Sequence, residues 1–112
     1  MHEVALCSAI ARIAHATADG LPVERVRVDI GHLRQVVPDT LRHCWEMVVF
    51  DTLLEGATLE VREVPTVIEC RSCGASTALQ ELTLVCSACR STDTTVLAGD
   101  ELNVTSVDVT VG

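Results

Sequence analysis

The sequence predicts an α+β fold, in which two helices pack on a small, mostly antiparallel three-stranded sheet that carries an inserted cysteine-rich module. Three observations lead to this prediction. Segments 1–18 and 38–56 repeat apolar residues at helical spacing. Segments 24–30, 58–64 and 101–111 alternate apolar and polar residues, as half-buried strands do. Residues 66–98 differ from both, because they hold four of the six cysteines and many serines and threonines.

The first helix is expected over residues 1–18. Its apolar face is formed by residues spaced i, i+4, i+7 and i+11, namely Leu6, Ile10, Ile13 and Thr17. The face is widened by Val4, Cys7, Ala11 and Ala14. Gly20 and Pro22 then end the helix. The second helix should begin at Pro38, because proline is favoured in a first helical turn. Its buried face carries Leu41, Trp45, Val48 and Thr52, and Gly56 is expected as its C-terminal cap.

Three strands are expected to complete the domain. From Glu24 to Ile30, valines and isoleucine point to one side and charged residues to the other. Thr58–Val64 alternates in the same way, with Leu59 and Val61 facing inward, and Pro65 ends it. The last strand runs from Glu101 to Val111. Its apolar phase slips by one residue at 105–106, which predicts a β-bulge.

The chain of 112 residues is long enough for one domain with a small insertion. We therefore expect an α/β domain over residues 1–65, completed by a C-terminal strand over 99–112, and a separate module over 66–98. The longest unbroken apolar runs are four residues, so no membrane span is expected. No basic segment precedes an apolar one at the start, so we expect no secretory signal and a cytoplasmic protein.

The charge of the chain limits its partners. Its formal net charge is −8, from 16 acidic residues against 8 arginines, and it contains no lysine. An acidic surface repels nucleic-acid phosphates, so nucleic acid is not an expected partner. Basic proteins and metal cations are the expected partners of such a surface. Trp45 and Phe50 are the only aromatic residues, which also disfavours stacking on bases.

The inserted module carries a metal-binding pattern. Cys70 and Cys73 form one CxxC pair, and Cys86 and Cys89 form a second pair twelve residues later. Two such pairs joined by a hairpin can place four thiolates around one zinc ion. Four cysteine ligands leave no position for water or substrate, so this would be a structural zinc ribbon. The alternatives are two redox-active pairs or two disulfides.

The first three residues form a second candidate metal site. The chain begins Met1-His2-Glu3. The α-amine, the His2 amide nitrogen and its Nδ1 can close a five- and a six-membered chelate ring around one ion. Such a nitrogen-rich planar site favours Ni(II) or Cu(II). By itself the pattern is a weak indication of a metal site. The alternative is an ordinary helix start, in which the negative charge of Glu3 interacts favourably with the helix dipole.

The remaining residues of chemical interest have simpler explanations. Cys7 and Cys44 lie on apolar helix faces and are expected to be small buried hydrophobic residues. His15, His32 and His43 lack ligand spacing with one another and are expected in surface or capping roles. The alternative for His32 and His43, which flank Asp39 in the sequence, is a position near the nickel site. Arg25 and Arg27 are expected on the solvent face of a strand, and the alternative is that they contact an acidic partner. No triad, phosphate-binding loop or carboxylate pair is recognisable, so the chain is not expected to be an enzyme.

Taken together, these motifs resemble a known family. The opening MHE, the segment VPDTLRHCWEMVVFDTLLEGATL over 37–59, the paired CxxC module and the closing GDELNVTSVDV over 99–109 are similar to the hydrogenase nickel-incorporation metallochaperones, the HypA/HybF family. The likeness covers nearly the whole chain. The resemblance implies a small α/β nickel domain with an inserted zinc ribbon, in a protein that carries nickel and holds zinc.

The resemblance also implies roles for individual residues and partners. Met1, His2, Glu3 and Asp39 would belong to the nickel site, and Cys70, Cys73, Cys86 and Cys89 would bind zinc. The implied recipient is the large-subunit precursor of [NiFe] hydrogenase, with a HypB-type GTPase as helper and, in some organisms, urease maturation proteins as further partners. A monomer or weak homodimer is expected.

Some residues depart from the family pattern. Arg90 stands after the second CxxC pair where the family commonly has glycine, which leaves the turn there open. Leu84 replaces a usual aromatic, and Asp100 stands where a basic residue is common. The alternative function is a zinc-ribbon adaptor that binds protein or nucleic acid, and a redox enzyme using its CxxC pairs is a further alternative.

Overall fold

The computed structural model describes residues 2–79 and 83–111, apart from the side chain of His2. The helices are α1 (His2–Ala18), η1, a short 3-10 helix (His32–Arg34), and α2 (Pro38–Val49). The strands are β1 (Val23–Gly31), β2 (Thr58–Val64), β3 (Thr66–Cys70), β4 (Ser76–Leu79), β5 (Thr94–Ala98) and β6 (Leu102–Val109). Within this part of the chain, no helix is long and apolar enough to cross a membrane.

The chain divides into two compact units. Unit 1 comprises Met1–Asp29, Val36–Arg62 and Asn103–Gly112, and unit 2 comprises Ile30–Gln35 and Glu63–Leu102. The two sheets have the strand orders β2-β1-β6 and β4-β3-β5. The predicted α+β class, with two helices, small and mostly antiparallel sheets and a four-cysteine cluster, is confirmed. The assignment of a nickel domain to 1–65 with 99–112, and of a zinc ribbon to 66–98, stays a prediction.

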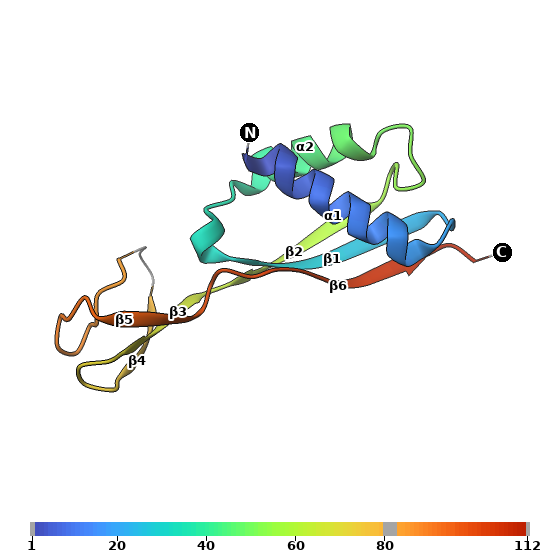
Figure 1. Cartoon of the computed structure of the whole chain (residues 1–112). Coiled ribbons are helices and arrows are strands. Elements are labelled where there is room, and N and C mark those ends of the chain that lie inside the picture. Colours follow the sequence, from blue (N-terminus) through green and yellow to red (C-terminus); the bar gives the residue numbers. More distant parts are fainter. Residues whose placement is uncertain (1, 80–82, 112) are drawn as a thin grey trace. The chain divides into compact units, whose positions relative to one another are not determined.

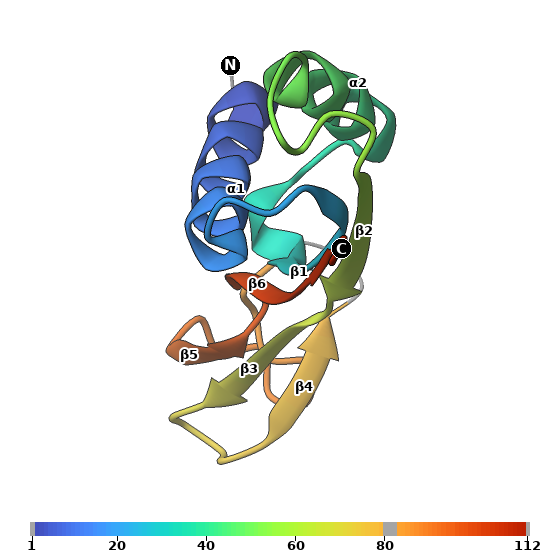
Figure 2. The ribbon, with the colours of Figure 1, turned by 90° about the vertical axis from the view of Figure 1, so that its right-hand side faces the viewer.

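Unit 1 has two layers, in which α1 and α2 lie side by side on one face of the sheet (Figures 1 and 2). Its core is aliphatic, as expected from a chain with two aromatic residues. In α1 the buried positions are Leu6, Cys7, Ile10, Ala14 and Ala18. The buried face therefore lies on the side of the expected one that carries Cys7 and Ala14, whereas Ile13, at 47% exposure, and Thr17 lie outside it.

Helix α2 begins at Pro38 as predicted but ends at Val49, so the expectation that Gly56 caps it is wrong. The backbone of Phe50 is not helical. The Thr52 hydroxyl donates to the Val49 carbonyl at 2.6 Å, so this carbonyl of the last helical turn has a hydrogen-bond partner. Gly56 instead takes a φ of 79° in the turn that leads to β2. The Trp45 indole N–H donates to the Ala57 carbonyl at 2.9 Å and fastens this turn to the helix.

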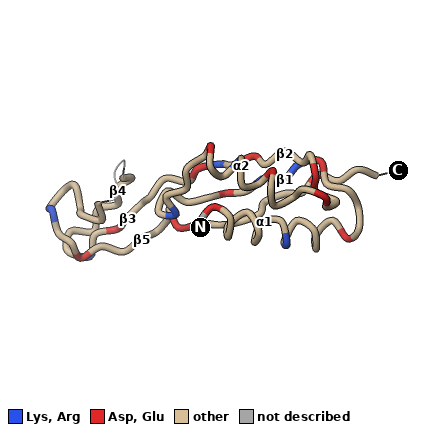
Figure 3. Tube along the Cα trace, turned by 90° about the horizontal axis from the view of Figure 1, so that it is seen from above, with Lys and Arg blue, Asp and Glu red and all other residues tan. Residues whose placement is uncertain are grey.

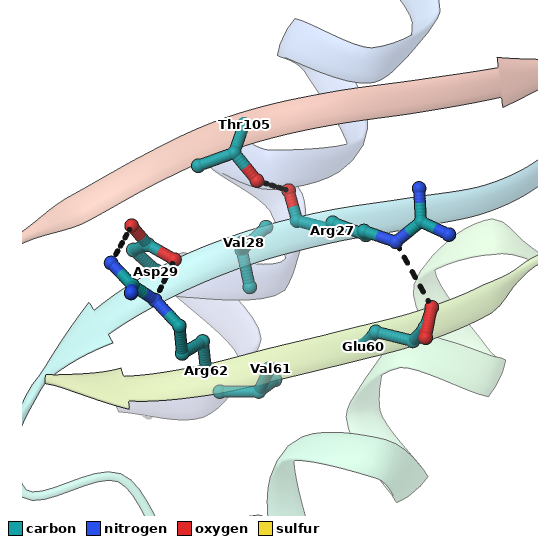
Figure 4. Close-up of a pocket in the computed structure, with 7 residues that line it drawn as sticks. All are labelled: Arg27, Val28, Asp29, Glu60, Val61, Arg62 and Thr105. Carbon is teal, nitrogen blue, oxygen red and sulfur yellow. Dashed lines mark hydrogen bonds and ion pairs between the residues drawn. The ribbon is translucent and has the colours of Figure 1, made fainter.

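The sheet of unit 1 has β1 at its centre. The predicted alternation is confirmed in β1, where Val26, Val28 and Ile30 are buried. Figure 4 shows β1 and β2 pointing one way and β6 the other, as a helical crossover between β1 and β2 requires. Val61 was expected inward but is 39% exposed, because β2 is an edge strand. The bulge expected at 105–106 stays a prediction.

Unit 2 is built on a second antiparallel sheet. Its central strand β3 pairs with β4 from Thr66↔Leu79 to Glu69↔Ser76 and with β5 from Val67↔Ala98 to Cys70↔Thr94. The register shifts between Val67 and Ile68, so Leu97 is the extra residue of a bulge. The strand β3 ends at Cys70, which places the first metal-ligand candidate where the sheet passes into a turn.

Two glycines allow the backbone of unit 2 to close tightly. The Gly31 N–H donates to the Glu101 carbonyl at 2.8 Å, and a Cβ at Gly31 would lie 2.0 Å from the Gly99 carbonyl oxygen. Gly99 itself has a φ of 115° and leaves no room for a side chain against Thr66. The segment of η1 is thereby attached to the loop between β5 and β6, where the Leu33 N–H also donates to the Gly99 carbonyl at 2.7 Å.

Candidate metal centre

The four cysteines of the two CxxC pairs meet in one cluster. The sulfur atoms of Cys70, Cys73, Cys86 and Cys89 all lie within 4.8 Å of one another. Cys70 Sγ is 3.5 Å from Cys89 Sγ, and Cys73 Sγ is 3.6 Å from Cys86 Sγ. A tetrahedron of sulfurs bound at ~2.3 Å has edges of about 3.8 Å. The cluster therefore already has the dimensions of a zinc–tetrathiolate site.

Each of the two pairs is positioned by its own backbone turn, and the two turns have the same hydrogen bonds. The Gly74 N–H donates to the Cys70 carbonyl at 2.8 Å, and the Arg90 N–H donates to the Cys86 carbonyl at 2.9 Å. The first cysteine of each pair then donates its own N–H five residues ahead, to Ala75 and to Ser91. Each pair thus holds its thiols by local hydrogen bonds, which explains why the spacing alone predicted the cluster.

The departure from the family pattern at Arg90 does not change the turn. Gly74 has a φ of 77°, and Arg90 has a φ of 61° at the matching position of the second pair. Arginine thus takes the left-handed conformation that glycine adopts without steric cost. The question left open by the sequence is answered: the turn is the same, and Arg90 holds it at some strain.

Backbone hydrogen bonds also favour the thiolate form at the first cysteine of each pair. The Cys73 N–H, followed by the Ser72 N–H, lowers the pKa of Cys70 to about 6. The Cys89 and Ala88 N–H groups lower the pKa of Cys86 in the same way. Zinc binds thiolates and not thiols, so these amides prepare the ligands for the metal.

The chemistry of the donor set fits a structural metal. Cys70 and Cys86 are each 1% exposed, whereas Cys73 and Cys89 lie at the surface. Beside the cluster, the Ser72 and Ser91 hydroxyls are 3.0 Å apart and link the two turns. Four sulfur donors complete a tetrahedral zinc coordination, so the centre stabilises unit 2 and offers no open position for chemistry.

The predicted nickel residues are described only in part. Met1 and the side chain of His2 lie outside the described residues. Glu3 is half-buried in the first turn of α1. Asp39 lies in the first turn of α2, where its exposed carboxylate accepts a hydrogen bond from Arg42 at 3.2 Å. The role of all four as nickel ligands stays a prediction.

The structure does bring the beginnings of the two helices together. Cys7, one turn after Glu3, donates its thiol to the carbonyl of Leu41, two residues after Asp39, at 3.4 Å. Figure 1 shows both helices beginning at the same end of unit 1. The N-terminal part of α1 therefore lies against the first turn of α2, which carries Asp39.

The other residues of interest lie as expected from the sequence. Cys7 and Cys44 are buried, at 0% and 5% exposure, and burial, with Cys44 and Glu3 nearby, raises the pKa of Cys7 to about 11. This thiol is therefore not a reactive group. His15, His32 and His43 are exposed.

Charged pairs cover the outer face of the unit 1 sheet. Arg25 and Arg27 both contact Glu60 of β2, at 3.2 and 3.3 Å, and both contact Asp108 of β6 at 3.5 Å. Figure 4 shows the adjacent groove of about 490 Å³, where Arg62 faces Asp29 at 2.8 Å. These arginines, which the sequence left open for an acidic partner, are satisfied by carboxylates of their own chain.

The family comparison agrees with the motifs and the cysteine cluster. Residues 1–109 match the family model described as "Hydrogenase/urease nickel incorporation, metallochaperone, hypA". The chain belongs to the HypA family. Metallochaperones of this kind carry a metal and are generally not enzymes. The predicted resemblance is confirmed.

Individual relatives extend over the same length. The hydrogenase maturation factor HypA of Nostoc sp. is 37% identical over 97% of this chain and 96% of its own. The HypA of Geobacter metallireducens is 38% identical over 97% of this chain and 99% of its own. The solution structure of the Ni metallochaperone HypA from Helicobacter pylori has the same fold, with a TM-score of 0.68 over 97% of both chains at 22% identity.

Sequence reasoning missed one group of surface residues. Met47 and Phe50 were assigned no role, yet they are among the most exposed large apolar side chains of the described residues, at 62% and 71%. The signal was available, since neither lies on the face of α2 that carries Leu41 and Trp45.

Proposed function

We propose that this chain captures Ni(II) at its first residues and delivers it to the large-subunit precursor of [NiFe] hydrogenase. The carrying observation is that Cys7, one turn after Glu3 in α1, contacts Leu41 in the first turn of α2. Glu3 and Asp39 thereby belong to one end of unit 1. Family membership in nickel incorporation supports the choice of nickel as cargo.

The donor atoms near the terminus suit nickel. A free α-amine, the His2 amide nitrogen and the imidazole Nδ1 form two fused chelate rings, and a further nitrogen or a carboxylate completes a planar set. Protons compete for each of these nitrogens, so binding weakens steeply in acid. Affinity alone would favour copper, so the supply of metal and the partners must select nickel.

Asp39 is suited to an exchangeable role. Its carboxylate is 94% exposed, and its ion pair with Arg42, whose side chain is 69% exposed, lies on the helix surface. Such exposed pairs contribute little free energy. Asp39 can therefore turn from Arg42 to an incoming cation at small cost, and back again when the cation leaves.

The remaining components of the proposal come from the family. We place the protein in the cytoplasm as a monomer or weak homodimer, with a HypB-type GTPase as helper and urease maturation proteins as additional partners where urease is made. Zinc in the four-cysteine centre is a resident ion, and nickel is the cargo.

Nickel titration of two variants tests the site. An added residue before Met1 converts the α-amine into an amide, and His2→Ala removes the imidazole, so each should abolish tight nickel binding seen by calorimetry. His15→Ala is the matched control, because His15 is an exposed histidine of the same helix, and it should bind as the unaltered chain does. Zinc content should stay the same in all three.

Unchanged nickel affinity in both terminal variants would refute the site. A chain that never binds nickel yet keeps its zinc would instead be the zinc-ribbon adaptor.

A further inference from the structure

The outer face of α2 is formed by His43, Glu46 and Met47, continued by Phe50 directly after the last helical residue. These residues lie opposite the buried positions Leu41, Cys44, Trp45 and Val49 at a period of 3.6 residues per turn. Asp39 begins the same row, since positions 39, 43, 46 and 50 are spaced i, i+4, i+7 and i+11. The row covers about 16 Å along the helix axis.

Two side chains on this face are unusual for a surface. Met47 is 62% exposed and Phe50 is 71% exposed, whereas Trp45, the other aromatic residue, is 3% exposed in the core. A chain with two aromatic residues thus leaves one of them in water. Aromatic residues and methionine are enriched at the centres of protein interfaces, where aromatic residues are frequent energetic anchors and methionine adapts its shape.

Acidic residues flank these two side chains in the sequence. Glu46 precedes Met47, Asp51 follows Phe50, and Glu55 contacts the turn through a 3.0 Å hydrogen bond from the Asp51 N–H to its carboxylate. Between residues 38 and 57 the chain carries four acids and one arginine. Figure 3 shows acidic positions, in red, along the part of the trace that is labelled α2.

We infer that the outer face of α2 is a docking surface for a partner protein that offers an apolar pocket with lysine and arginine at its rim. Met47 and Phe50 would enter the pocket, and Glu46 and Asp51 would face the basic rim. A second copy of this chain would set acid against acid, and so would an anionic membrane or a nucleic acid. Charge complementarity therefore selects a basic protein.

The size of the surface indicates a short-lived complex. Two exposed side chains with their rim cover much less than the roughly 800 Å² per partner of a standard stable interface. In such contacts a few buried anchors carry most of the free energy, and rim charges mainly raise the association rate. A partner held there also lies along the helix face that begins at Asp39, which is one of the proposed nickel residues.

The inference rests on the proposed function for its partners, the purified HypB-type GTPase and the purified hydrogenase large-subunit precursor of the same organism. Binding of each to the full chain is measured by biolayer interferometry at two salt concentrations. Met47→Ser with Phe50→Ser should weaken binding of at least one partner tenfold or more. Ile13→Ser, at a 47% exposed apolar residue of α1, is the matched control and should change affinity less than twofold.

A charge pair of variants tests the rim. Glu46→Arg should weaken binding by fivefold or more and remove most of its salt dependence, whereas Glu24→Arg, at an exposed acid of β1, should do neither. Trp45 fluorescence confirms that each variant is folded. Nickel titration of the same variants should show unaltered binding, which separates loss of docking from loss of the metal site.

Three results would overturn the inference. The first is equal affinity of the Met47/Phe50 double variant and the unaltered chain for both partners. The second is a concentration-dependent dimer that the double variant abolishes, because the surface would then seat a second copy. The third is an unaltered chain that binds neither partner, which would also remove these partners from the proposed function but leave its nickel site standing on the titration.

Discussion

Each of the two units of this protein is stabilised in a different way. In unit 1, two helices bury an aliphatic core against a sheet, with Ile10, Val26, Val28 and Leu41 almost completely enclosed. Among the described residues of unit 2, Ile30 and Ile68 are the large apolar side chains that are buried. In place of a large apolar core, unit 2 has a cluster of four thiols on turns that local hydrogen bonds stabilise. A metal ion can thus replace the burial that a short segment cannot provide.

The largest expected effect comes from removing the metal, because unit 2 should then unfold while unit 1 stays folded. A structural zinc contributes on the order of 10 kcal/mol to folding. Trp45 lies in unit 1 and is the only tryptophan, so its fluorescence reports that unit alone. Cobalt bound to the four thiolates reports unit 2. A chelator should abolish the cobalt–thiolate absorption and leave Trp45 fluorescence unchanged; simultaneous loss of both signals would show that the units fold as one.

The converse experiment removes part of the core of unit 1. Trp45→Ala should lower the free energy of unfolding of unit 1 by about 3–5 kcal/mol, since it leaves a cavity and an unpaired Ala57 carbonyl. Urea unfolding followed by far-ultraviolet circular dichroism measures this loss. The cobalt–thiolate absorption should persist in the variant. Loss of cobalt binding would contradict the division of labour between the units.

Alkaline pH should weaken unit 1 through Cys7. Burial raises the pKa of Cys7 from 9.0 to about 11, so the folded chain keeps a proton that the unfolded chain releases. This stabilisation is complete below pH 9 and disappears as the pH rises through 11. The chain has no lysine or tyrosine, whose ordinary pKa values lie in this window, and Cys7→Ala separates Cys7 from the other cysteines. Urea unfolding between pH 8.5 and 11 should show a decline that Cys7→Ala removes.

The smallest expected effect concerns the turn after the second CxxC pair. Arg90→Gly should stabilise unit 2 by roughly 0.5–1 kcal/mol, because glycine adopts the φ of 61° without a steric penalty. Gly74→Arg is the mirror change and should destabilise the first turn. Chelator competition measured with cobalt would record both, and a destabilised Arg90→Gly variant would show that the arginine side chain makes a contribution of its own.

The metal centre was predictable from the sequence because its causes are local. A CxxC pair positions its thiols through hydrogen bonds among six consecutive residues, as the Cys70–Ala75 turn shows. Helix α2 was predictable at its start for the same reason, since proline acts at its own position. The end of α2 was not predictable, because the apolar spacing continues to residue 52 although the helix ends at Val49. There the Thr52 hydroxyl donates to the Val49 carbonyl, which the spacing does not reveal.

Other features depend on contacts between distant residues. The exposure of Val61 follows from the place of β2 at the edge of its sheet, which alternation cannot reveal. The pairing of Arg25 and Arg27 with Glu60 and Asp108 requires the strand order β2-β1-β6. For the nickel residues, the chelating pattern of Met1 and His2 is legible in the sequence, but the approach of the two helix starts depends on tertiary packing.

The bond between Gly31 and Glu101 has a consequence for biosynthesis. These residues are about 70 positions apart, and a ribosome adding 5–20 residues per second needs roughly 4–14 s to cover that distance. All four cysteines are synthesised within this interval, before the acceptor of Gly31 exists. The hydrogen bonds that attach η1 to the loop after β5 can therefore form only when nearly the whole chain has been made, so the end of β1 stays without this partner for most of synthesis.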